Sequence, residues 1–199
     1  MTGRYVTLEP LQVAHAASLW PLQEDHLWDY MFDGPFSNEQ EFTESIARKS
    51  ESHDPQAPRF LAVLVNHQAV GIASFMRDDP KHRVIEVGSI VFTRALQRTT
   101  AATEAMFLMA KYAFEEMQYR RYEWKCNALN LLSRRAAERL GFTLEGIFRQ
   151  HMIVKGQNRD TAWFSMLDSE WPARKIEFER WLHPSNFTED GTQLTHLSH

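Results

Sequence analysis

The sequence predicts an α+β protein in which a mixed, largely antiparallel sheet is flanked by helices. Segments with strand and helix patterns follow one another in the order β-α-α-β-β-β-α-β-α-β-β. Two central strand candidates are joined by the turn Asn66-His67-Gln68, which indicates an antiparallel hairpin. The 199 residues are 43% hydrophobic, typical of one globular domain, which we expect to span residues 1–183.

The first half of the chain predicts one strand, two helices and three further strands. Residues 5–11 alternate weakly, and residues 13–22 carry apolar side chains at helical spacing. A second helix is predicted over 37–50, where Ser37 and Gln40 have the spacing of a capping box. After a polar loop, the three strands are predicted at 59–65, 70–76 and 84–92.

The second half alternates between helices and strands. Apolar periodicity predicts a helix over 100–117, and Gly141 supplies the left-handed end of a helix over 130–140. Polar residues from 184 to 199 predict a flexible tail. The remaining predicted elements are strands at 121–126, 143–154 and 161–167 and a short helix at 172–183.

Composition excludes several classes of function. With 22 basic and 26 acidic residues the net charge is −4, so no overall positive field favours nucleic acid, although a local basic patch stays possible. The single cysteine, Cys126, excludes an internal disulfide framework, and we expect it to be a small buried strand residue. The nine histidines show no metal-binding motif, so no metal is expected. The N-terminus has no apolar signal region, and no apolar run could span a membrane, so we expect a cytoplasmic protein.

Two strand-to-helix junctions carry the strongest functional signals. Residues 97–102, Gln-Arg-Thr-Thr-Ala-Ala, open a helix after a buried strand, and a helix start offers free amides to a phosphate group. An ordinary helix start with exposed arginines is the alternative. The second junction, residues 130–142, reads Asn-x-x-Ser-x-x-x-x-Glu-x-Leu-Gly-Phe.

Together these junctions resemble the GCN5-related N-acetyltransferase (GNAT) superfamily, and more closely its ribosomal-protein alanine acetyltransferase branch. The resemblance covers roughly residues 3–170 and implies the acyl-CoA N-acyltransferase fold, with Thr100 in place of the glycine that is usual in the pyrophosphate loop. It implies acetyl-CoA as the co-substrate, held between two splayed parallel strands. The cofactor-binding residues implied are Ile90, Val91, Phe92, Gln97, Arg98, Thr99, Thr100, Ala101, Ala102, Asn130 and Arg134. Asn130 is also a good helix N-cap in its own right.

Acetyl transfer to an amine requires a base, a stabilised oxyanion and a protonated leaving thiolate. Glu86 is our candidate base, because Ile85, Val87 and Val91 predict a core face and leave Glu86 and Gly88 on the other, unless a bulge shifts the register. Its alternative is a solvated strand residue. The amide of Val91 is the expected oxyanion donor, and Ser133 is the candidate for stabilising the thiolate or a polar residue of the helix start. No triad surrounds Cys126, which favours direct transfer.

The acceptor is less well specified. Aromatic residues between 20 and 36, with Trp163 and Phe164, predict either an acceptor wall or core packing. Acidic residues in that stretch favour a cationic acceptor, either a small amine or a peptide N-terminus; nucleic-acid and membrane partners are not expected. A homodimer is common in the family. The competing hypothesis is a non-catalytic acyl-CoA-binding or interaction module on the same fold.

Overall fold

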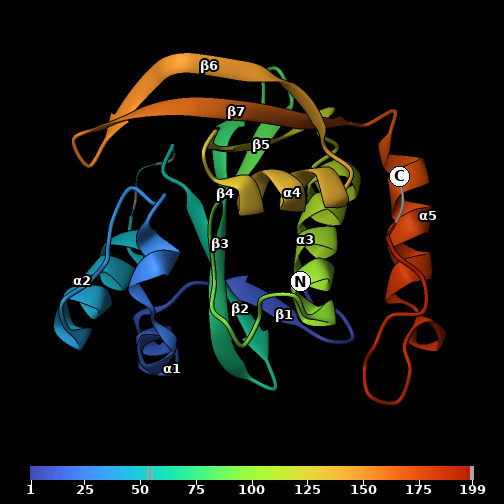
Figure 1. Cartoon of the computed structure of the whole chain (residues 1–199), viewed down its shortest axis with the longest axis horizontal. Coiled ribbons are helices and arrows are strands. Elements are labelled where there is room, and N and C mark those ends of the chain that lie inside the picture. Colours follow the sequence, from blue (N-terminus) through green and yellow to red (C-terminus); the bar gives the residue numbers. More distant parts are fainter. Residues whose placement is uncertain (53, 55, 198–199) are drawn as a thin grey trace.

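The computed structural model describes residues 1–52, 54 and 56–197 and confirms the predicted fold class (Figure 1). In this described part of the chain, seven strands form one sheet in the order β1-β2-β3-β4-β5-β7-β6, in which only β4 and β5 are parallel. The strands are β1 (Thr7–Pro10), β2 (Arg59–Val65), β3 (Gln68–Asp79), β4 (Val84–Phe92), β5 (Arg121–Asn127), β6 (Thr143–Val154) and β7 (Gln157–Leu167). The α-helices are α1 (Ala16–Leu19), α2 (Glu39–Ser50), α3 (Thr100–Lys111), α4 (Leu131–Arg139) and α5 (Trp171–Leu182).

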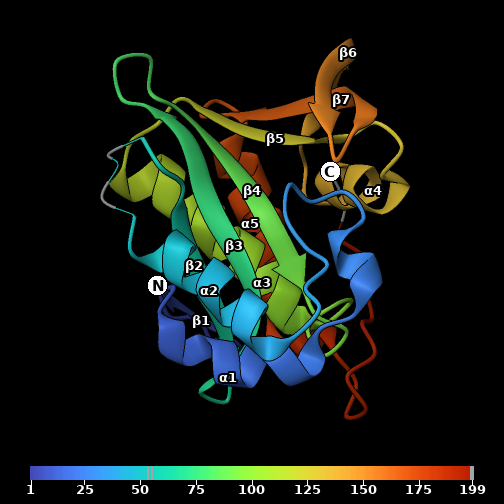
Figure 2. The ribbon, with the colours of Figure 1, turned by 90° about the vertical axis from the view of Figure 1, so that its left-hand side faces the viewer.

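Helices cover both faces of the sheet (Figures 1 and 2). The larger core, which includes Ile85, Val87 and Phe164, lies on the face covered by α3, α4 and α5. A smaller core around Trp28, Phe42 and Val91 lies under α1 and α2 on the opposite face. The long β6–β7 hairpin lies beside β5, because β7 pairs with β5 along the whole length of β5, and the two halves of the chain meet along β4 and β5.

Several helix ends differ from the prediction. The predicted helix 13–22 is a short α1 between two 3-10 turns, because Pro21 lacks the amide that would continue an α-helix. Helix α2 begins two residues later than predicted, since Asn38 and not Ser37 is its N-cap and accepts from the Glu41 amide at 3.0 Å. Helix α3 ends in a π-helical turn over Tyr112–Glu116, in which the Met117 amide donates to the Tyr112 carbonyl.

A β-bulge in β4 changes which side chains face each core. The pairing of β3 with β4 shifts between Ile72 and Ser74, and Ser89 has a φ of 49°. Ile85 and Val87 therefore pack in the larger core, whereas Val91 packs in the smaller one. The expectation that these three residues share a face is wrong for Val91, because the extra residue in the bulge reverses the alternation.

Both chain ends pack against the helices. The buried Glu104 side chain of α3 accepts hydrogen bonds from the amides of Arg4, Tyr5 and Val6 at 2.6–3.0 Å. In the segment predicted to be a flexible tail, Phe187 lies edge-on to Trp181 of α5 and Leu197 is buried. Among the described residues, no helix combines the length and the apolar character that crossing a membrane requires.

Candidate active site

Strands β4 and β5 part in the middle of the sheet. Their parallel pairing runs from Val84 with Arg121 to Val87 with Trp124 and stops there, although both strands continue. The bulge at Ser89 lies just beyond the last pair and bends β4 away from its neighbour. The structure thus has two splayed parallel strands, with α3 and α4 beginning beside them.

The backbone of β4 offers hydrogen-bonding groups where the strands part. Val91 pairs with Ile72, and the Thr93 amide donates to the Val70 carbonyl at 3.3 Å, so alternation directs the Val91 amide toward β3. The backbone groups of Ile90 and Phe92 face the other way, toward β5. The carbonyl of Phe92 accepts from the Gln97 side chain at 2.7 Å, which fixes the loop after β4 to the strand end.

The loop before α3 presents amides at the helix start. Thr99 is the N-cap, and its hydroxyl oxygen accepts from the Ala102 amide at 3.1 Å. In the part of the chain that the structure describes, the amides of Arg98, Thr100 and Ala101 have no hydrogen-bond acceptor. Arg98 is exposed and has a φ of 61°, a left-handed conformation. This conformation was not predicted, because it usually occurs at glycine and position 98 is an arginine. These unpaired amides are the groups that hold phosphates at helix N-termini.

The start of α4 lies against the end of β5. Asn130 is its N-cap and accepts from the Ser133 amide at 3.0 Å, while the Ser133 hydroxyl oxygen accepts from the Trp124 indole at 3.0 Å. The adjacent Cys126 is buried as expected; burial raises the pKa of its thiol, and a hydrogen bond from Ser133 acts in the opposite direction. Arg134 donates to the Ala128 carbonyl at 3.3 Å, and its Nε is buried without a partner among the described residues.

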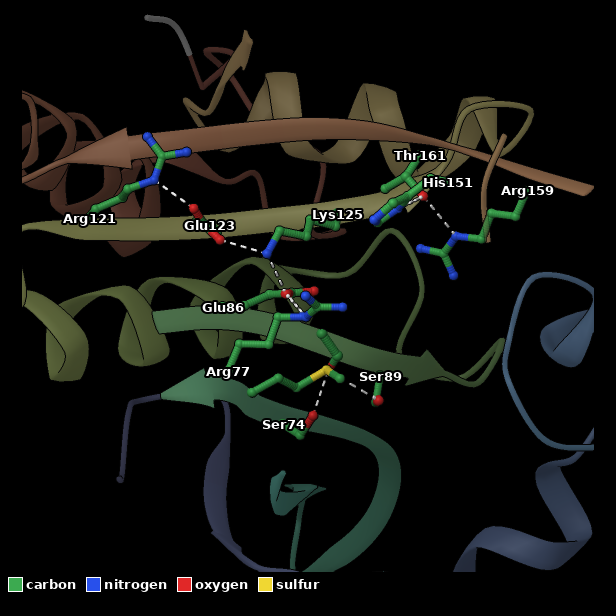
Figure 3. A network of polar contacts seen from close by, with 12 residues as sticks. Ser74, Arg77, Glu86, Ser89, Arg121, Glu123, Lys125, His151, Arg159 and Thr161 are labelled. Carbon is green, nitrogen blue, oxygen red and sulfur yellow. Dashed lines mark hydrogen bonds and ion pairs between the residues drawn. The ribbon is translucent and has the colours of Figure 1, made fainter. Parts of the chain in front are cut away.

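Glu86 lies on the opposite face of β4 from α3 and is 5% exposed, so it is not a solvated strand residue. Its Oε2 atom accepts from Lys125 Nζ at 2.9 Å and lies 3.1 Å from Arg77 Nε (Figure 3). A Cβ atom added to Gly88 would lie 3.4 Å from Oε1, so this oxygen faces Gly88 beside the bulge. Burial raises the pKa of Glu86, although Lys125 and Arg77 oppose the shift.

Glu86 belongs to a row of alternating charges (Figure 3). Lys125 is also 2.6 Å from Glu123, which is 2.6 Å from Arg121. Arg121 in turn donates two hydrogen bonds to Glu145 on β6 at 2.6 and 2.7 Å. Lys125, Arg121 and Arg77, the cations of this row, were not predicted from the sequence. One signal existed, because charged residues alternate with apolar ones along 121–126 and so place one charged face on β5.

The aromatic residues divide between core and acceptor side. Trp28 is 2% exposed and Phe164 is fully buried, as core packing predicts. Phe32 and Trp163 instead contact charged groups: the Phe32 ring is 5.0 Å from the Arg159 guanidinium, and Lys125 Nζ lies 3.9 Å from the Trp163 ring.

The acidic residues of the same stretch are partly engaged. Asp33 pairs with Lys49, and Glu24 is 3.4 Å from His26 and 3.8 Å from Arg94. They are therefore weaker attractors of a cationic acceptor than their number in the sequence indicated.

Comparisons with known proteins agree with this geometry. A family described as "Acetyltransferase (GNAT) domain" matches residues 6–143. A crystal structure of a GCN5-related N-acetyltransferase from Brucella melitensis superposes with a TM-score of 0.94 and 47% identity over 98% of this chain and 90% of that one. A GNAT-family structure from Chromobacterium violaceum gives a TM-score of 0.79 and 41% identity over 86% and 87% of the two chains.

A curated relative points to the same enzymes. The chain is 29% identical over 113 residues to YdaF of Bacillus subtilis, a protein named as a ribosomal N-acetyltransferase. The match covers 57% of this chain and 61% of YdaF.

Proposed function

The chain belongs to the GNAT family of acetyltransferases, and on that premise we propose that it transfers the acetyl group of acetyl-CoA directly to a primary amine within a ternary complex. That it is an N-acetyltransferase follows from the family. The cofactor contacts, the catalytic residues and the direct route are the proposal. The observation that carries it is the parting of β4 and β5 between the free amides of α3 and the Ser133 hydroxyl of α4.

The residues at this place fit a coenzyme A thioester. The amides of Arg98, Thr100 and Ala101 suit its diphosphate, with Thr99 and Ala102 fixing the helix start and Gln97 holding the loop. The backbone of Ile90 and Phe92 suits the pantetheine arm, with Val91 anchoring this stretch to β3. Asn130 and Arg134 would hold the arm and the adenosine phosphates from α4. Acetyl-CoA supplies the acetyl group as an activated thioester.

Glu86 is the proposed base. An ammonium must lose its proton before its nitrogen can attack, and Glu86 Oε1 faces the parting of the strands while Oε2 holds the two cations. The raised pKa of the carboxyl makes it a better proton acceptor near neutral pH than an exposed glutamate. The pairing with Lys125 and Arg77 fixes the orientation of the carboxylate.

Backbone and hydroxyl groups would stabilise the charges that develop. Since the Val91 amide faces β3, we assign the oxyanion role to the Ile90 amide, which faces β5. The Ser133 oxygen accepts from Trp124, and its own O–H, which acts on the Cys126 thiol, would turn to donate to a departing thiolate. The same hydroxyl acts on the Cys126 thiol in the direction expected of such a donor.

The arrangement around Cys126 supports direct transfer. Its thiol is buried and has a raised pKa, so the thiolate that a covalent acyl-enzyme requires is disfavoured. The neighbouring cations, Arg134 and Arg159, do not reverse this direction.

The test is release of coenzyme A thiol from acetyl-CoA in the presence of a panel of amines, with mass spectrometry of the products. We expect amine-dependent thiol release, reduced in Glu86→Gln and Ser133→Ala without loss of coenzyme A affinity. A protein that binds acetyl-CoA and acetylates no amine in the panel or in cell extract would overturn the proposal in favour of a binding module.

A further inference from the structure

We propose that the acceptor is a small amine that also carries a carboxylate, and that the guanidinium of Arg159 binds this carboxylate. The inference rests on the proposed function and specifies its substrate class. It separates free amino acids and similar molecules from the N-terminus of a protein, where the carboxyl next to the amine has become an amide.

Arg159, on β7, is a buried cation that has no acidic partner among the described residues. It is 7% exposed, and its Nε donates to the Thr161 hydroxyl at 3.3 Å. In the part of the chain that the structure describes, no carboxylate lies within ion-pair distance of its guanidinium, and Nη1 and Nη2 have no acceptor. Burial lowers the pKa of Arg159, because the charged guanidinium loses solvation there. A buried guanidinium is stable when a carboxylate meets its planar fork of donors.

The neighbouring charges do not provide this partner, because they are already balanced. Three cations, Arg77, Lys125 and Arg121, alternate with three anions, Glu86, Glu123 and Glu145. Each member pairs with at least one neighbour of opposite sign in this row. Arg159 therefore adds one positive charge beside this balanced row, and a single anionic group on the ligand would compensate it.

The surroundings of Arg159 suit a small ligand. Figure 3 shows its side chain extending from β7 toward the side of Lys125 and Glu86. The Phe32 ring covers the guanidinium at 5.0 Å, and Lys155, in the β6–β7 turn, donates to the Trp28 carbonyl at 2.8 Å. The segment between α1 and α2 thus meets the hairpin beside Arg159. These contacts place a ring and a loop segment beside the guanidinium, so a compact ligand fits the proposal better than an extended chain.

An aromatic wall borders the same place. The Phe148 and Trp163 rings are 4.6 Å apart, and His151 lies 5.4 Å from Phe148. His151 also shares the Thr161 hydroxyl with Arg159, at 2.9 Å (Figure 3). An apolar or planar side chain on the acceptor would pack against this wall, whereas the carboxylate would meet Arg159.

Arg159 also lies close to the proposed reacting groups. The charge of Glu86 acts on Arg159, and Arg159 in turn acts on Cys126, the thiol that Ser133 contacts. Arg159 is therefore within electrostatic reach of both the proposed base and the proposed thiolate site. We therefore assign the carboxylate of the acceptor to Arg159 and its amine to Glu86.

The experiment compares matched amines with acetyl-CoA as donor. L-phenylalanine, L-phenylalaninamide and phenethylamine form one set, L-alanine, L-alaninamide and ethylamine form another, and a trialanine amide represents a peptide N-terminus. Of the two amino acids, we take the one with the higher kcat/KM and expect this value to exceed those of its amide and its decarboxylated amine at least tenfold. The lower basicity of amino amides makes more of their nitrogen available at neutral pH, so this bias opposes the expected result.

Variants test the assignment to Arg159. Arg159→Gln should reduce kcat/KM for the amino acid at least tenfold and leave the amide within about twofold, whereas Arg159→Lys should lose less. Arg48→Gln, an exposed arginine of α2, is the matched control and should change neither value. Titration with coenzyme A checks that each variant is folded; if Arg159→Gln does not fold, Arg159→Lys and Phe32→Leu carry the comparison.

The outcomes separate the two claims. Equal use of amides, simple amines or the peptide, or an equal loss for all acceptors in Arg159→Gln, would overturn the carboxylate assignment and leave the acetyltransferase intact. Failure of the wild type to acetylate any member, despite binding acetyl-CoA, would overturn the proposed function and this inference with it.

Discussion

The two sides of the site where β4 and β5 part present different kinds of chemical group. Toward α3 and α4, the available groups are mostly backbone amides and local caps, such as Thr99 and Asn130. Toward the β6–β7 hairpin, they are charged and aromatic side chains from strands β3 to β7, including Glu86, Lys125 and Arg159. Backbone recognition depends little on residue identity, whereas side-chain recognition depends on it entirely. We infer that the first side holds a ligand common to the family and that the second selects the acceptor.

The largest expected effect is a loss of catalysis on the acceptor side that leaves cofactor binding unchanged. Glu86→Gln removes the proposed base, so kcat should fall about a hundredfold or more, while the dissociation constant of coenzyme A stays unchanged. Steady-state kinetics and calorimetry measure the two quantities. Glu123→Gln, which removes another anion from the same row, should change kcat less than about threefold if Glu86 has a catalytic and not merely a structural role. Equal losses in both variants would contradict the assignment.

The next largest expected effect is a loss of coenzyme A affinity on the cofactor side. Thr100→Asp and Arg98→Glu place a negative charge beside the free amides, and each should weaken coenzyme A binding about ten- to hundredfold by repelling the diphosphate. Arg48→Glu on α2 changes the net charge as much as Arg98→Glu does and serves as the control. Unchanged affinity in both loop variants would remove the phosphate site from α3.

A third variant tests a residue that we expect to stabilise the fold without contacting cofactor or acceptor. Glu104 accepts three amide hydrogens from the N-terminal segment, and in Glu104→Gln one of the two oxygens becomes an amide nitrogen that cannot accept them. We expect the free energy of unfolding to fall by about 2 kcal/mol, measured by denaturant titration. Under conditions in which the variant is fully folded, its coenzyme A affinity should stay the same. A loss of affinity in the folded variant would give Glu104 a direct role in binding.

The pH profile should differ between the two sides. Glu86 must be ionised to act, so kcat/KM should rise with pH through a pKa above the ordinary 4.5 and then level off. Arg77→Gln removes a charge that lowers this pKa, so the rise should move to higher pH. Coenzyme A affinity should not follow the same curve. A profile that Arg77→Gln leaves unmoved would argue against Glu86 as the titrating group.

The smallest effect concerns the end of the charge row. Arg121 and Ser165 lower the pKa of Glu145 to about 2, so its stabilising contribution is present above the unfolded value of 4.5 and is lost as pH falls toward 2. Because the Glu145 side chain is 40% exposed, we expect less than about 1 kcal/mol. Glu145→Gln should flatten the acid limb of the stability curve by this amount, and a larger change would show that the row is more strongly coupled than its exposure indicates.

The same contrast explains what could be predicted from the sequence. The helix starts at Thr100 and Leu131 depend on side chains within three residues, so local patterns identified them. The partners of Glu86 come from Arg77 and from Lys125, 39 residues away, and depend on which strands are neighbours. Arg159 carries no motif at all, and only burial beside Phe32 distinguishes it from other arginines. The sequence allowed for a bulge near Gly88. That the bulge turns Val91 to the other face of the sheet could be seen only from the strand register in the structure.

The most direct measurement is a titration of the isotope-labelled protein with coenzyme A, followed by the backbone amide resonances. We expect the largest shifts at Arg98, Thr100 and Ala101, a second group around Asn130 and Ser133, and small shifts at Arg159. Shifts that leave the start of α3 unperturbed, or no shifts at saturating coenzyme A, would contradict the central claim that the cofactor lies where β4 and β5 part.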